Sequence, residues 1–235
     1  MLADVTRLEL RLRRRSAIGY AAGMAVYTLV VVALYPAFKN ETSLNRLSGS
    51  TAAALFGVTG PLTSPAGWLN ANIYANFFPL IMLLLTIGYG AACLAGQDEN
   101  GTLALLAAAV TVCVFIGRGF QLAISPASTV AIAAALILMG LDFGLITMAV
   151  GAATGRRGTA LGLGAGLAAA SYLLSSLAST IPSIRPGRYL SLFYWSVGDN
   201  QVGRGVSAAD FAVLIVAGLL ALFAAVVAFG RADLS

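Results

Sequence analysis

The chain has 235 residues, of which 59% are apolar and only 10% are charged, against about 25% charged residues in an ordinary soluble domain. Its net charge of +5 comes mainly from arginines beside apolar runs, a placement that encodes membrane topology and argues against a nucleic-acid-binding face. The composition therefore excludes a soluble domain and predicts a polytopic, all-α membrane protein that forms a single transmembrane domain over residues 1–235.

The first element is a basic amphipathic leader over residues 1–15. Leucines and a valine supply apolar contact, and the cationic side chains include Arg11, Arg13, Arg14 and Arg15. A segment of this kind lies along an anionic inner leaflet, so we expect an interfacial helix. The apolar run that follows shows no convincing cleavage signature, which favours an uncleaved anchor over a signal peptide.

Six apolar runs follow the leader. Five of them are long enough to cross a hydrocarbon core about 30 Å thick, and the short third run reaches that length when it is extended past Arg118, whose side chain can snorkel. The predicted spans cover residues 16–36, 72–94, 103–124, 130–153, 159–181 and 211–229. The leader arginines and Arg156-Arg157 predict that both termini are cytoplasmic. The richness in Ala, Gly and Arg, with a single Lys, favours a bacterial protein and hence a bacterial inner membrane. Pro79 predicts a kink in the second span.

The segment between spans five and six is too aromatic to lie in water. Phe193, Tyr194 and Trp195 stand at its middle, after Tyr189 to Leu192. Aromatic residues gather at the membrane–water interface, so the sequence predicts a re-entrant or interfacial segment on the outer side.

Missing residue types exclude several kinds of chemistry. With no histidine, the chain cannot form an HExxH zinc site or a Ser–His catalytic pair. Its one lysine, Lys39, does not lie in a phosphate-binding GxxxxGK[ST] loop, so no ATPase site is encoded. The sequence predicts no catalytic residues and no metal site.

Asp142 is the one acidic residue well inside an apolar span. A carboxylate at that depth is costly and is expected to face the bundle or a wet cavity, paired or protonated. It is either a polar lock between helices or a group that handles protons or cations.

Small residues recur four apart along the fifth span, at Gly158, Gly162, Gly166 and Ala170. This spacing lets a second helix backbone approach closely. The row predicts either a contact within the bundle or a seam between two copies, and the sequence does not decide between them.

An acidic, polar turn separates the second and third spans, comprising Gln97, Asp98, Glu99, Asn100, Gly101 and Thr102. Gly101 permits a tight backbone, and the Thr102 hydroxyl can cap the following helix. With the basic leader, the six spans, Leu103 to Leu106, the outer aromatic segment and the C-terminal Arg-x-Asp-Leu, this turn resembles permease subunits of bacterial type-2 ABC exporters.

The resemblance implies that an ATP-binding cassette subunit, which carries ATP and Mg, docks on residues Asp98 to Thr102 beside Arg11 to Arg15. It also implies a second permease subunit, identical or homologous. One departure is that Leu106 runs straight into Ala107 to Gly117, where the family has a basic, proline-containing loop. Either this hairpin is shorter than in the family, or the sequence lacks part of it.

The expected function is the permease part of an ATP-driven exporter of amphiphilic or hydrophobic cargo, such as a drug, a lipid or an antibiotic. It would work by alternating access, which the separate nucleotide-binding subunit would drive. The alternative is a motor-free membrane protein, either a proton-linked carrier that uses Asp142 or a structural scaffold.

Overall fold

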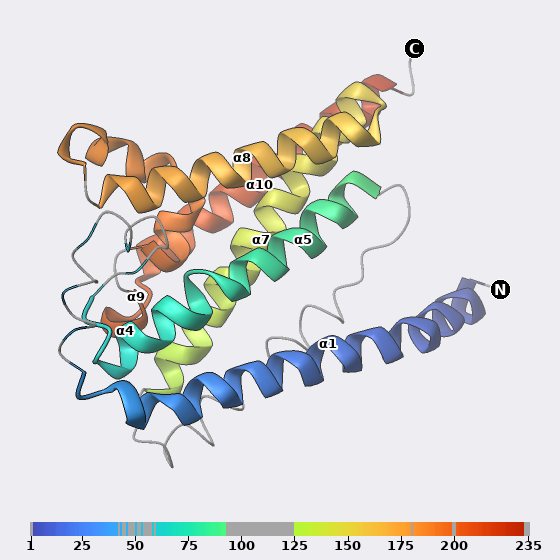
Figure 1. Cartoon of the computed structure of the whole chain (residues 1–235). Helices are drawn as coiled ribbons and strands as arrows, with labels where there is room; N and C mark the ends of the chain where they lie inside the picture. The colour runs from blue at the N-terminus through green and yellow to red at the C-terminus, as the bar shows by residue number, and fades with distance from the viewer. Residues whose placement is uncertain are drawn as a thin grey trace.

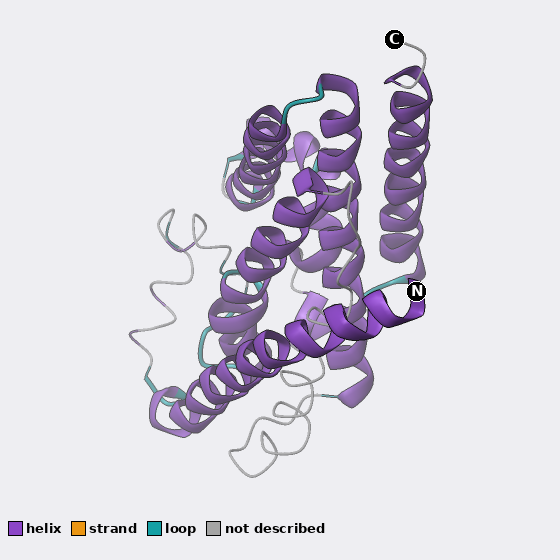
Figure 2. Cartoon of the chain, turned by 90° about the vertical axis from the view of Figure 1, so that its right-hand side faces the viewer, coloured by secondary structure: helices purple, strands orange, loops and turns teal. Residues whose placement is uncertain are grey.

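The computed structural model describes residues 2–41, 60–92, 125–179, 181–198 and 201–232, with a few single positions between 43 and 58. Within α1 (Leu2–Phe38), the backbone alone is described up to residue 17. All regular elements of this described part are helical, and it contains no strand (Figures 1 and 2). The all-α prediction is confirmed to this extent.

Five helices in the described part are long and apolar enough to cross a membrane. The first is α1. The second is built from α4 (Pro65–Leu69), a π-helical turn η1 (Asn70–Tyr74) and α5 (Phe77–Ala92), which follow one another. The other three are α7 (Pro126–Thr154), α8 (Arg157–Ala178) and α10 (Ala208–Ala232). The candidate spans are Ala21–Phe38, Pro65–Gly88, Pro126–Thr154, Arg157–Ala178 and Ala208–Gly230. The chain is therefore a multi-pass helical membrane protein, and the third predicted span, 103–124, lies outside the described residues.

α1 and α8 run along the bundle in one direction, and α5, α7 and α10 run in the opposite direction (Figure 1). We name the end at which α1 begins the leader end, and the opposite end, which carries α4, η4 (Pro182–Leu190), η5 (Tyr194–Gly198) and α9 (Gln201–Arg204), the cap end. α5 finishes at the leader end, whereas α7 starts at the cap end. The predicted six-span order requires α5 and α7 to run in the same direction, as they do.

Local sequence signals mark where the helices begin and end. The Ser64 hydroxyl caps α4 by accepting a hydrogen bond from the Gly67 N–H, and Pro65 follows at the first helical position. α7 ends at Gly155, whose φ of +65° is a left-handed conformation that glycine adopts at little cost. At the start of α10, Ser207 and Asp210 cap each other's backbone N–H groups.

α7 lies at the centre of the bundle and contacts α5, α8 and α10. Glycines allow two of these contacts. A Cβ at Gly140 would come within 3.3 Å of Met82 and Thr86 on α5, and one at Gly164 on α8 would collide with Thr147 of α7. Small residues thus replace large apolar side chains where helix backbones pack closely in a membrane.

Two elements differ from the predicted boundaries. The leader is the first part of the uninterrupted helix α1 rather than a separate segment, and its interfacial position stays a prediction. The second span begins at Pro65 instead of residue 72, because α4 and η1 extend it toward the cap end. Regular α-helical geometry is interrupted at residues 75–76, one turn before Pro79, whose missing N–H removes a helical hydrogen bond there.

Candidate functional site

The predicted docking turn for an ATPase, residues Asp98 to Thr102, lies outside the described residues. α5 ends at Ala92, at the leader end of the bundle, which is also where residues 11–15 of α1 lie (Figure 1). The assignment of these residues to partner binding therefore stays a prediction.

Asp142 lies on α7 and is 2% exposed. Its Oδ2 is buried and has no hydrogen-bond partner in the described part of the chain. Its Oδ1 would be 2.5 Å from a Cβ on Gly218, so α10 packs here only because residue 218 has no side chain. The carboxyl group therefore faces a neighbouring helix, as expected for an acidic side chain inside a membrane, and one of its two oxygens has no partner among the described residues.

The small-residue row on α8 faces away from the described bundle. Gly158, Gly162, Gly166 and Ala170 are exposed, and a Cβ on any of the three glycines would have no atom within 4 Å. The internal contact of α8 with α7 uses other small residues instead, Ala160 opposite Gly151 and Gly164 opposite Thr147. The row is open on the outside of the described bundle, and its role as a seam between copies stays a prediction.

The outer aromatic segment folds back into the protein as η5. Phe193 is 3% exposed, and its ring packs against Phe143 of α7 and edge-on against Tyr172 of α8. Tyr194 is also buried, Trp195 is half-buried, and Tyr189 and Leu190 at the start of the segment are exposed. Phe193 and Tyr194 close the cap end of the core, and the re-entrant or interfacial position of the segment on the outer side of the membrane stays a prediction.

An apolar groove of about 790 Å³ runs between α5 and α8. Leu80, Leu83, Leu84 and Ile87 form its α5 wall, and small residues of α8 around Ala165 form the other. The Asn76 amide and the Tyr172 hydroxyl bring polarity to its cap end. A volume of about 300–1,000 Å³ with mostly apolar walls and few polar groups is typical of small-molecule sites.

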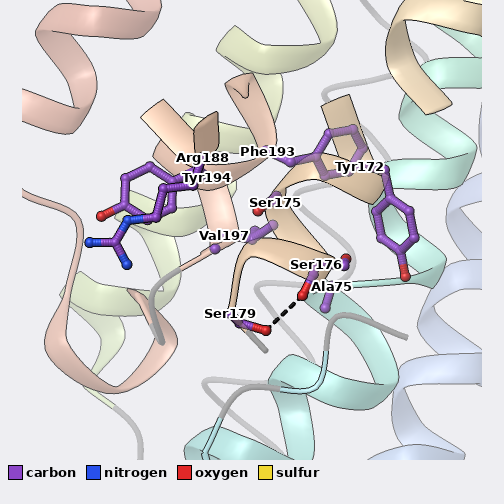
Figure 3. Close-up of a pocket in the computed structure, with 10 residues that line it drawn as sticks. Ala75, Tyr172, Ser175, Ser176, Ser179, Arg188, Phe193, Tyr194 and Val197 are labelled. Carbon is purple, nitrogen blue, oxygen red and sulfur yellow. Dashed lines mark hydrogen bonds between the residues drawn. The ribbon is translucent and has the colours of Figure 1, made fainter. Parts of the chain in front are cut away.

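A smaller pocket of about 60 Å³ adjoins the groove at the cap end (Figure 3). Ser175, Ser176 and Ser179 from the last turns of α8 line it, together with Arg188 of η4. Figure 3 shows these serines between the Arg188–Tyr194 pair on one side and Tyr172 on the other. The pocket and the groove share three wall residues, Ala75, Tyr172 and Phe193.

Tyr172 joins the two cavities. Its hydroxyl donates a hydrogen bond of 3.1 Å to Oδ1 of Asn76, which ties α8 to the start of α5 across the cap end of the groove. The Phe193 ring stands edge-on to Tyr172 with a centroid separation of 5.4 Å. Polar and aromatic side chains therefore close the groove at its cap end, whereas apolar side chains line it along the spans.

Sequence reasoning singled out Phe193 and Tyr194, which line the pocket, but missed the rest of this site. It assigned no role to Tyr172, to the serines of α8 or to Arg188. The available signal was a run of hydroxyl residues in the last two turns of the fifth span, at Ser171, Ser175, Ser176 and Ser179. Hydroxyl groups at that density in an apolar helix favour a wet surface over a lipid-facing one.

No group of three or more metal-ligating side chains occurs among the residues that the structure describes. Comparison with protein-family models, with curated proteins and with solved structures finds no match to this chain. The functional argument therefore rests on the residues and their geometry.

Proposed function

We propose that the chain is the permease subunit of an ATP-driven exporter of amphiphilic or hydrophobic compounds, powered by a separate nucleotide-binding subunit. The observation that carries the proposal is the groove between α5 and α8, which is large enough for such a compound and almost wholly apolar along the spans. A polar solute would find few partners there, whereas an apolar chain would be surrounded by leucine and alanine.

The arrangement of the spans also supports the proposal. α5 and α8 form the two walls of the groove and are tied at the cap end by the Tyr172–Asn76 hydrogen bond. A motor that pulled on the leader end of either helix would change the width of the groove. By resemblance to type-2 ABC exporters, the nucleotide-binding subunit is predicted to dock on the acidic turn after α5 and on the basic leader.

The test is co-purification of the motor from the native membrane. A tagged chain, extracted gently, should bring down an ATP-binding cassette subunit, and vesicles that hold the complex should transport a hydrophobic dye only with ATP. Glu99→Ala combined with Asp98→Ala should release the subunit, while Glu41→Ala, outside the predicted docking turn, should not. Transport by a complex that contains no ATPase would refute the proposal.

A second candidate function is favoured by one observation, the buried Oδ2 of Asp142 without a partner among the described residues. A carboxyl group in that state suits a proton-linked carrier without a motor. Asp142→Asn, which keeps the shape and removes the acid, would abolish transport and leave assembly intact if this candidate is right. An exporter whose Asp142 is only structural should transport normally after the same change.

A further inference from the structure

α10 is attached to the rest of the described chain through one seam along the span. It packs extensively on α7 and meets η5 at the cap end, whereas neither α5 nor α8 forms a comparable contact with it. Figure 2 shows α10, which leads to the C-terminus, at the edge of the bundle. Whatever weakens the seam between α7 and α10 therefore acts on the main contact that holds this helix in place.

Asp142 brings a carboxyl group into this apolar seam. The buried face of α10 comprises Leu214, Ala221 and Ala225, with Gly218 between them. The Asp142 carboxyl group lies against Gly218, where a Cβ would be 2.5 Å from its Oδ1. Its Oδ2 is buried and has no hydrogen-bond partner among the described residues. The tightest point of the seam thus contains an acid that nothing in the described chain satisfies.

The described elements bring no cation to this carboxyl group. Asp142 is the only charged residue of α7, and α5 has no acidic or basic residue. On α10, Asp210 and Arg231 lie about 12 and 20 Å along the helix from Gly218. Asp210 is at the cap end, where it already pairs with Arg204 of α9 at 3.5 Å.

The other titratable groups on the elements packed against α7 are Tyr89 of α5, Arg157 and Tyr172 of α8 and Tyr194 of η5. Tyrosines are neutral at physiological pH. Arg157 is exposed beyond the leader end of α7, which is about 18 Å along the helix from Asp142. An ionised Asp142 would be a buried charge without a counterion in the described chain, which is far more costly than a neutral carboxyl group that lacks one hydrogen bond.

We propose that Asp142 is a proton-binding site that controls this seam: α10 packs on α7 while the carboxyl group is protonated and moves away when it is ionised. On ionisation the O–H bond breaks, its electron pair stays on the carboxylate, and the proton passes to water that enters as the helices separate. Because the packed state binds one proton more than the separated state, raising the pH favours separation and lowering it favours packing. The inference goes beyond both candidate functions, since it concerns one helix contact and requires neither a motor nor cargo.

The two ends of α10 should respond differently. At the cap end, the ion pair between Arg204 and Asp210 and the reciprocal caps of Ser207 and Asp210 hold the start of the helix. Gly205, just before it, has a φ of +84°, a left-handed conformation that suits a turn. At the leader end, a Cβ on Gly230 would have no atom within 4 Å. The movement should therefore be largest at the leader end.

The experiment measures distances between α7 and α10 in the full-length chain in lipid nanodiscs, with both native cysteines replaced by serine. Spin labels at Ala153→Cys and Val226→Cys report on the leader end, since both positions are exposed. A second pair, at Ala127→Cys and Ala212→Cys, reports on the cap end from two exposed positions. As the pH is raised, the leader-end distance should increase and the cap-end distance should change less.

Asp142→Asn removes the acid and keeps its shape, so the leader-end distance should stay short at every pH. The matched control is Glu41→Gln, which removes an exposed acid outside the seam and should leave the response to pH intact. Infrared difference spectra of the packed state, wild type against Asp142→Asn, should show loss of the carbonyl band of a protonated carboxylic acid. Should Asp142→Asn fail to fold, Asp142→Leu, an apolar side chain of similar size, should give the same packing at every pH.

Three outcomes would overturn the inference: a leader-end distance that does not depend on pH in the wild type, a response to pH that survives Asp142→Asn, or no loss of the protonated-acid band. The last is expected if Arg118, which lies outside the described residues, pairs with Asp142. None of these measurements involves transport or an ATPase, so the export proposal stands or falls separately.

Discussion

The hydroxyl of Tyr172 on α8 lies 3.1 Å from Oδ1 of Asn76, a residue 96 positions earlier in the chain, and donates a hydrogen bond to it. This contact closes the cap end of the groove between α5 and α8. The same tyrosine also lines the small pocket, so one side chain belongs to both halves of the candidate site.

Tyr172→Phe should weaken the contact between α8 and the start of α5 at the cap end of the groove, without changing the volume of the groove. Loss of one hydrogen bond between membrane helices should lower the free energy of unfolding by about 0.5–1.5 kcal/mol. Thermal unfolding in detergent measures this cost. The control is Tyr189→Phe, which removes an exposed hydroxyl that accepts a hydrogen bond from Arg188; an equal loss there would show that the Tyr172 contact carries no special weight.

Gly218→Ala should destabilise the packing of α10 on α7. The new methyl group would lie 2.5 Å from Oδ1 of Asp142, and overpacking of this kind costs typically about 1–3 kcal/mol. Gly230→Ala on the same helix meets nothing within 4 Å and should be tolerated. In an Asp142→Ala background the cost at residue 218 should shrink, because the colliding group is gone, and a double-mutant cycle measures that coupling.

Gly164→Ala and Gly162→Ala should separate the two faces of α8. The first places a methyl group against Thr147 and should cost about 1–3 kcal/mol, while the second points away from the bundle and should leave the chain as stable as before. Chemical or thermal unfolding of both variants provides the measurement. Equal effects would contradict the orientation of α8 described above.

Gly162→Leu tests whether the outward small-residue row is a seam between copies. A large side chain there should convert a dimer to a monomer while the unfolding temperature of the monomer stays unchanged. Light scattering of the detergent-solubilised protein gives the oligomeric state. Leu163→Phe is the matched control, because Leu163 is an exposed residue beside the row rather than on it; dissociation by this change as well would argue against a specific seam.

Trp68→Phe should weaken the packing of the cap end of α1 against α4. The indole Nε1 donates a hydrogen bond of 2.9 Å to the Val31 carbonyl oxygen, and the ring stacks on Phe38 with a centroid separation of 5.5 Å. Losing the buried hydrogen bond and part of the ring contact should cost about 1–2 kcal/mol in the free energy of unfolding, measured by thermal unfolding in detergent. Trp195→Phe is the comparison, since its indole hydrogen bond to the Tyr189 carbonyl oxygen is exposed and should matter less.

The sequence is a good guide to where the helices lie, because hydropathy and local signals decide that. Ser64-Pro65 and Ser125-Pro126 begin helices, and Gly155 ends one, for reasons that involve only neighbouring residues. The five described spans therefore overlap their predicted ranges. The early start of the second span at Pro65 was missed, because Gly67 and Asn70 look like loop residues when taken alone.

The sequence is a poor guide to which faces pack together. α8 carries small residues on two faces, and Ala160 and Gly164 are the ones that pack on α7, because Gly151 and Thr147 stand opposite them. The aromatic run around Phe193 has the composition of an interfacial belt, yet it packs on Phe143 and Tyr172. Both outcomes depend on partners far away in the chain, which no local pattern contains.

α1 is fastened to the rest of the described chain near one of its ends. The Tyr35 hydroxyl donates a hydrogen bond to the Thr63 carbonyl oxygen and the Trp68 indole donates one to Val31, both in the cap-end half of the helix. Toward the leader end, a Cβ placed on Gly19 or Gly23 would have no atom within 4 Å, and the helix diverges from α5 (Figure 1). A helix held along only one half acts as a lever, so a sideways push on its leader end would load the contacts of Tyr27, Val31 and Tyr35 before any other part of the described bundle.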